Sequence, residues 1–86
     1  MGRMNCILTI TQWKAPQRYR HQQRHFYGTL RSETGEVLQE ILQCATRQRV
    51  IEVAKEWADR VSSQIYYQHK IKLDITINVK EGVEKF

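Results

Sequence analysis

The sequence predicts an α+β domain, in which one main helix packs on one face of an antiparallel sheet of three to four strands, in the order β-β-β-α-β. Three observations predict this fold. Residues 46–66 repeat apolar side chains at three- and four-residue intervals, the spacing of one helical face. Residues 70–80 alternate apolar and polar side chains without interruption, as a half-buried strand does. Two stretches of apolar and β-branched residues, 4–13 and 24–31, precede the helix and are predicted to be strands.

An unusual connection joins these first two strands. Residues 14–23 contain the only proline and almost no aliphatic side chain, so we expect an exposed basic loop or arm. In the strand that follows, Gly28 indicates either a β-bulge or a close backbone approach. Residues 32–35 have the composition of a turn, with Gly35 suited to a left-handed conformation.

Residues 36–44 fit two different structures. Their apolar side chains would suit a helix, but at about 100° per residue this apolar side would lie well over 100° from that of the helix that follows. One continuous helix over residues 36–66 would therefore bury two different sides. We prefer a third strand, paired antiparallel with residues 25–31, followed by a helix that Thr46 caps. Two helices broken near Thr46 are the alternative.

The main helix is expected to carry the largest anchor of the core. Trp57 stands in the middle of its apolar stripe, and we expect this side chain to be mostly buried against the strand at residues 70–80. Residues 68–69 form the predicted connection to that strand, and residues 81–86 are expected to be a frayed tail. A chain of 86 residues is long enough for one hydrophobic core only, so a single domain is predicted.

Positive charge is concentrated near the start of the chain. The net charge is +5, yet residues 1–31 hold six of the fourteen Lys and Arg residues and none of the nine Asp and Glu residues. Residues 32–86 are close to neutral. Between residues 14 and 31 the basic side chains alternate with aromatic ones. This mixture suits nucleic acid, because Arg and Lys neutralise phosphates while aromatic rings stack on bases.

We therefore predict a nucleic-acid-binding surface, to which the start of the main helix adds two residues. Arg47 and Arg49 oppose the helix dipole there, and such a pair can form an anion pocket with the backbone amides. The alternative is two exposed arginines whose repulsion from the dipole is screened by salt. The full predicted set is Lys14, Arg18, Tyr19, Arg20, Arg24, Arg31, Arg47 and Arg49.

No pattern predicts catalysis, a cofactor or a metal. His21 and His25 have the spacing of two zinc ligands on a helix, but they stand in a predicted loop and strand, with no Cys-x-x-Cys pair. Cys6 and Cys44 fit the reduced, buried thiols of a cytoplasmic protein. The apolar runs are too short for a membrane span or a signal peptide, so we expect no membrane partner and a cytoplasmic location.

The sequence thus favours a small non-enzymatic binding module that contacts the nucleic-acid backbone through its basic N-terminal half. The alternative is a protein–protein interaction or regulatory module with no nucleic-acid role. In that case the positive charge serves solubility, and two copies join as a homodimer through the sheet edge at residues 70–80.

Overall fold

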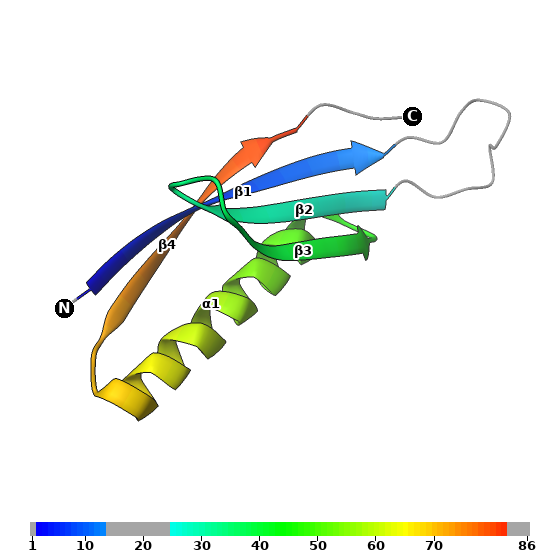
Figure 1. Ribbon diagram of the computed structural model, residues 1–86. Helices are drawn as coiled ribbons and strands as arrows, with labels where there is room; N and C mark the ends of the chain where they lie inside the picture. Colours follow the sequence, from blue (N-terminus) through cyan, green and yellow to red (C-terminus); the bar gives the residue numbers. More distant parts are fainter. Residues whose placement is uncertain (1, 14–24, 83–86) are drawn as a thin grey trace, which may run out of the picture.

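A four-stranded sheet with one helix packed on one face forms the body of the protein (Figure 1). The computed structural model describes residues 2–13 and 25–82. The predicted α+β class and the predicted order of elements are confirmed. The elements in chain order are β1 (Gly2–Trp13), β2 (His25–Ser32), β3 (Val37–Cys44), α1 (Arg47–His69) and β4 (Leu73–Glu81).

The strand order is β3-β2-β1-β4. The sheet is mixed, whereas the sequence predicted an antiparallel one. β2 pairs antiparallel with both β1 and β3, whereas β1 and β4 run parallel. The path of the helix explains why β4 runs parallel to β1. α1 leaves the end of β3 at one edge of the sheet and carries the chain back to the opposite edge, so β4 starts from the other end and runs in the same direction as β3 (Figure 1).

Residues 37–44 form the preferred third strand, so the helical alternative is wrong. β3 follows β2 through the predicted turn, where Gly35 adopts a φ of 91° and its N–H donates to the carbonyl of Ser32 at 3.0 Å. Register shifts interrupt the pairing of β2 with β3. Ile41 and Cys44 are buried while Leu42 is exposed. This three-residue interval between buried positions explains why the apolar pattern also fitted a helix.

The start of α1 is as predicted, and its end comes about one turn later. Thr46 caps the helix, because its hydroxyl accepts a hydrogen bond from the N–H of Arg49 at 3.1 Å. Residues 68–69, predicted as a connection, belong to α1. Lys70 ends the helix in the left-handed conformation, with φ at 57°, and donates its N–H to the carbonyl of Tyr66 at 2.8 Å.

Because the helix is longer than predicted, β4 begins later. Residues 70–72 form the connection, and the strand starts at Leu73 rather than at residue 70. The strand also includes Glu81, and Gly82 still donates its N–H to the carbonyl of Ile10 at 2.6 Å. The predicted tail is therefore shorter at its start, and its remaining residues, 83–86, lie outside the described part of the chain.

The core lies between α1 and the sheet. The side chains of α1 that are buried are small, and Trp57 is partly buried beside them in a cluster that also includes Ile75 and Ile77 of β4. The buried hydrophobic residues are Cys6, Leu8, Ile10, Leu30, Ile41, Cys44, Val50, Ala54 and Ala58. The helix thus contacts the sheet through the small side chains of Val50, Ala54 and Ala58, and Trp57 lies beside them.

Gly28 on β2 is a point of very close approach between the sheet and the helix. A methyl group at this position would overlap Cγ1 of Val50 and lie 3.2 Å from Cδ1 of Leu8. The pairing of β2 with β3 also shifts register between Phe26 and Gly28. The predicted irregular pairing is therefore present, whereas the close approach is made by the side chain of Val50 and not, as was predicted, by a backbone.

We expect Gly28→Ala to lower the free energy of unfolding by about 1–3 kcal/mol, because the new methyl group must displace Val50. Val50→Ala should cost about 2 kcal/mol by leaving a cavity. In the double variant the added methyl occupies the space that valine vacates, so its loss should be smaller than the sum of the single losses. Urea denaturation measures all three; additive losses would show that the two side chains do not compete for one space.

Candidate nucleic-acid interface

The basic segment predicted to bind nucleic acid joins β1 to β2. Five predicted contact residues, Lys14, Arg18, Tyr19, Arg20 and Arg24, lie outside the described residues, which end at Trp13 and resume at His25. Trp13 and His25 are paired neighbours in the sheet. Their rings stack, with centroids 5.9 Å apart and planes inclined by 24°. The two ends of residues 14–24 therefore leave the sheet side by side, from an aromatic pair.

The same aromatic pair stands at one end of the sheet face opposite α1. Cys6, Leu8 and Ile10 face the helix, so the alternation of β1 places Trp13 on the opposite face. Tyr27 belongs to this face as well, because it pairs with the odd-numbered Thr11, two residues from Trp13. The rings of Trp13 and Tyr27 and the hydroxyl group of Thr11 thus share one face of the sheet, beside the start of the basic segment. Bases can stack on such rings.

Arg47 and Arg49 lie at this end of the molecule, where α1 begins, but each is already bound by carboxylates. Arg47 donates from Nε to Glu81 at 2.7 Å, and Arg49 contacts Glu52 at 3.3 Å and Glu56 at 3.4 Å. The hydrogen bond to Glu52, followed by the charge of Glu56, raises the pKa of Arg49 above its ordinary value. These carboxylates weaken the predicted anion pocket.

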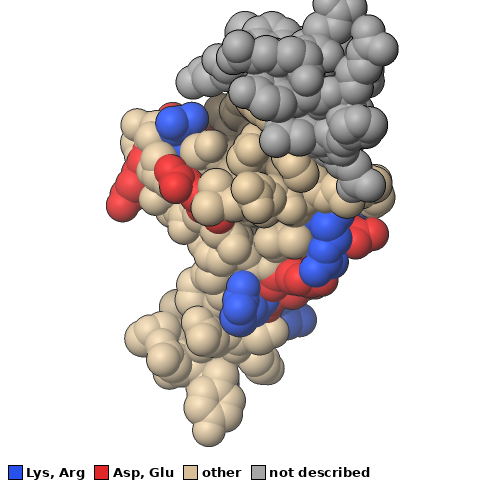
Figure 2. Space-filling model, turned by 90° about the vertical axis from the view of Figure 1, so that its right-hand side faces the viewer, with Lys and Arg blue, Asp and Glu red and all other residues tan. Residues whose placement is uncertain are grey.

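The surface at this end shows the same mixture of signs. On the face shown in Figure 2, the visible Lys and Arg side chains lie beside Asp and Glu side chains, instead of forming one positive patch. The described residues include nine Lys and Arg against eight Asp and Glu, whereas residues 14–24 hold four Lys and Arg and no acid. Almost all of the excess positive charge therefore belongs to one short segment.

Arg31 stands apart from the other predicted contact residues. It is exposed near the β2–β3 turn, where it pairs with Ile7 and Val37 in the sheet. Six residues separate it from His25 along β2, which corresponds to about 20 Å at roughly 3.3 Å per residue. Arg31 is near the basic segment in sequence, but the extended strand carries it to the far end of the sheet.

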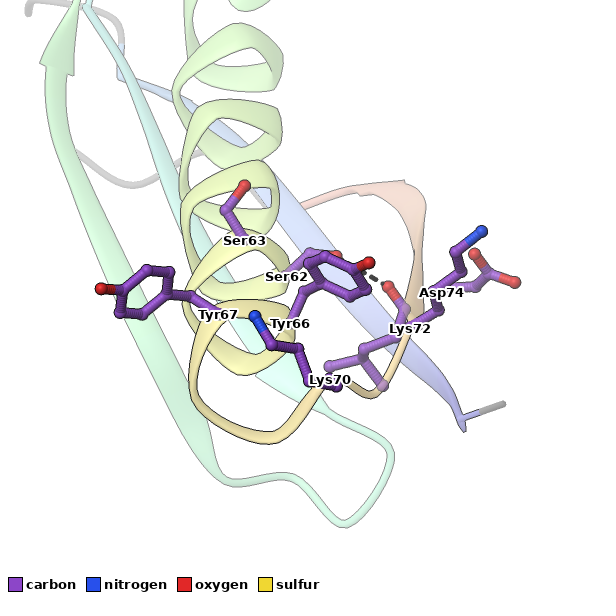
Figure 3. A pocket seen from close by; sticks show the side chains of 8 residues that line it. Ser62, Ser63, Tyr66, Tyr67, Lys70, Lys72 and Asp74 are labelled. Carbon is purple, nitrogen blue, oxygen red and sulfur yellow. Dashed lines mark hydrogen bonds between the residues drawn. The ribbon is translucent and has the colours of Figure 1, made fainter.

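A second polar and aromatic cluster, which was not predicted from the sequence, lies at the C-terminal end of α1 (Figure 3). Exposed Tyr66 and Tyr67 flank the ammonium group of Lys70, which is 5.6 Å from each ring centroid. Ser62 ties the helix to β4 by donating to the carbonyl of Leu73 at 2.9 Å. The pocket here has a volume of about 490 Å³ and is lined by Ser62, Ser63, Tyr66, Tyr67, Lys70, Lys72, Leu73 and Asp74.

This pocket is open to solvent, and its chemistry is that of a cation held against two aromatic faces. It could receive an aromatic or anionic group at the surface. The signal in the sequence was the run from residue 66 to residue 70, YYQHK. The predicted helical stretch ended at Tyr66, so Tyr66 and Tyr67 stood at the margin of the predicted element and Lys70 lay beyond it.

The cysteines are buried and free, as predicted. β2 lies between the strands that carry Cys6 and Cys44. Burial, with a smaller effect from the charge of Glu33, raises the pKa of the Cys6 thiol. The thiolate that a nucleophile requires is therefore disfavoured. Within residues 2–13 and 25–82, no group of three His, Cys, Asp or Glu residues is placed to hold a metal ion, and His21 lies outside this part.

Over the described ranges, no helix combines the length and the apolar character needed to cross a membrane. The chain has no match among models of protein families, among curated proteins or among solved structures.

The raised pKa of Cys6 predicts how stability depends on pH. The pKa of the thiol is 9.0 in the unfolded chain and higher in the folded protein. The associated stability is present below this unfolded pKa and is lost as the pH rises through the folded-state pKa. We expect the urea midpoint to fall as the pH rises from about 8 to about 10, and to fall less in Cys6→Ala, which lacks the thiol. An equal fall in both proteins would show that other groups cause the dependence.

Proposed function

We propose that the protein is a small non-enzymatic module that binds the nucleic-acid backbone through its basic N-terminal half. One observation carries the proposal: nearly all the excess positive charge lies in residues 14–24, and the ends of this segment leave the sheet together at the Trp13–His25 stack. Phosphates attract the positive segment, and the neighbouring rings offer a surface on which bases stack.

The observations that support a role in nucleic-acid binding differ among the predicted contact residues. Lys14, Arg18, Arg20 and Arg24 supply the charge of the segment, and Tyr19 adds a ring within it. Arg47 and Arg49 lie at the neighbouring end of α1, where phosphate must compete with their carboxylate partners. Arg31 is about 20 Å from His25 along β2 at roughly 3.3 Å per residue, so it contacts the same ligand only when that ligand follows the sheet.

A protein–protein module without a nucleic-acid role is the second candidate. It is favoured by the position of β4, which is an edge strand of the sheet and can add a strand from another chain. The two candidates differ in ligand and in salt dependence, so binding measurements separate them.

A salt titration tests the proposal directly. Binding of a labelled random duplex and a labelled random single strand, followed by fluorescence anisotropy, should show a log-log salt slope of about −3 to −4, as expected for roughly four neutralised phosphates. Arg18, Arg20 and Arg24 changed together to Ser should flatten the slope by about two to three units. Thermal stability should change little, because exposed charges contribute little to folding.

A matched control separates position from net charge. Arg3, Lys55 and Arg60 are exposed on β1 and α1, and changing all three to Ser removes the same total charge. This control should lower the slope by less than about one unit, because these residues lie outside the proposed contact. Equal effects of the two triple variants would show that net charge alone drives binding. Failure of the wild-type protein to bind either nucleic acid at low ionic strength would falsify the proposal and leave the protein–protein candidate.

The ion pair between Arg47 and Glu81 generates a separate prediction. Glu81→Gln removes the competing carboxylate while keeping the shape of the side chain, so nucleic-acid affinity should rise and the slope should steepen by up to about 0.9. Arg47→Ser should change affinity little, since this arginine is already neutralised. Stability should change by less than about 1 kcal/mol in both variants, because the pair is exposed. A loss of affinity in Arg47→Ser as large as that of a single substitution within residues 14–24 would contradict this view of Arg47.

A further inference from the structure

The two edges of the sheet differ in how well they could accept another strand. The edge formed by β3 is irregular, because register shifts interrupt its pairing with β2 and Gln43 adopts a positive φ of 49°. The edge formed by β4 is regular: its nine residues pair with Gly2–Ile10 of β1 without a shift. Bulges protect an edge strand from pairing, and β4 has none along this register.

The side of β4 that faces α1 is also incompletely covered. Ile75 and Ile77 pack against the core but are only partly buried, and Val79 is 37% exposed. β4 forms one edge of the sheet, and α1 packs on one face of that sheet (Figure 1). Among residues 2–13 and 25–82, no strand pairs with the outer edge of β4. Apolar side chains at such a regular edge favour contact with a further strand on the same side of the sheet.

The opposite side of β4 carries a pair of complementary charges. Asp74 and Lys80 are exposed, are six residues apart and therefore lie on the same side of the strand. Neither forms an ion pair with another residue in the described ranges. In Figure 3 the carboxylate of Asp74 points away from Tyr66 and Tyr67, and so stays accessible beside the pocket.

We propose that the occupant of this edge is a second copy of the chain, joined antiparallel through β4 about a two-fold axis at Ile77. Ile77 is the middle residue of Leu73–Glu81, so this register pairs the whole strand with itself. Asp74 then stands opposite Lys80 of the partner subunit, and the symmetry repeats this pair at the other end. On the side of the helix, Ile75 meets the partner's Val79, and Ile77 meets the partner's Ile77.

Charge selects this register over its neighbours. An axis at Thr76 would place Lys72 opposite the partner's Lys80, which is repulsive. An axis at Asn78 would place Asp74 opposite the partner's Gly82 and leave both charges unpaired. The strand is thus complementary to itself in the one register that also pairs it over its full length. The product is an eight-stranded sheet with both helices on the same face.

A charge exchange tests both the dimer and its register. Sedimentation velocity at physiological salt should show a monomer–dimer equilibrium for the wild-type protein. Asp74→Lys and Lys80→Asp each create two like-charge contacts across the axis, so each should weaken dimerisation about ten-fold or more. The double variant Asp74→Lys/Lys80→Asp restores two opposite-charge pairs and should recover the dissociation constant to within about three-fold.

Lys72→Asp is the matched control, because it also changes a charge on the same segment but faces no charge in the proposed register. It should leave the dissociation constant nearly unchanged, whereas an axis at Thr76 predicts tighter association. Circular dichroism of each variant checks that the fold is kept. A wild-type protein that remains monomeric at several hundred micromolar overturns the dimer, and single variants that dimerise as well as the wild type overturn this surface.

This inference is independent of the proposed nucleic-acid contact. Changing Arg18, Arg20 and Arg24 to Ser should abolish most of the salt-dependent binding and leave the dimer intact. The Asp74 and Lys80 variants should weaken the dimer without removing the basic segment. Loss of one property therefore does not entail loss of the other.

Discussion

The close contact between α1 and β2 is the constraint on which the rest of the structure depends. Gly28 and Val50 meet so closely that one further methyl group does not fit between them. The helix can settle at this depth because the next buried residues along it, Ala54 and Ala58, are small. Leu8 and Leu30 fill the space at the sides of the contact and are completely buried. A larger residue at Gly28 would lift the helix away from the sheet and loosen this packing.

This packed body is nearly neutral, and the excess charge is confined to a connection between two of its strands. The separation has a physical advantage. Four further basic residues in the core-forming elements would add to the repulsion among those already there and require compensation, as the carboxylates around Arg47 and Arg49 illustrate. Four basic residues in residues 14–24 can interact with a polyanion while the packing between α1 and the sheet carries the stability.

The two proposals fit one geometry. β1 ends at Trp13 on the side where β4 ends, because these strands are parallel. An antiparallel pairing of two β4 strands therefore turns the basic segments of the two copies to opposite ends of the joined sheet. Two weak contacts on one nucleic acid bind more tightly than either alone when the ligand spans both. Dimerisation would in this way strengthen a contact that uses only a few phosphates per chain.

Much of the fold followed from the sequence by itself, because alternation and helical periodicity report directly which side of an element is buried. The strand beyond the helix, the Thr46 cap, the turn at Gly35 and the irregular pairing at Gly28 were all predicted from such local patterns. The charge of residues 14–24 is likewise a property of the sequence alone. It is the basis of the proposed nucleic-acid contact, and it does not specify where the chain places its other charges.

Tertiary structure decided what depends on residues far apart in the chain. The parallel pairing of β1 with β4 results from the path of α1 across the sheet, which no local pattern encodes. Arg31 was separated from the other basic residues by the extended strand, and Arg47 was neutralised by Glu81, 34 residues further along the chain. The pocket at Tyr66 and Lys70 required the last turn of the helix to form. Periodicity determines which side of an element is buried, but only packing determines which distant side chains meet.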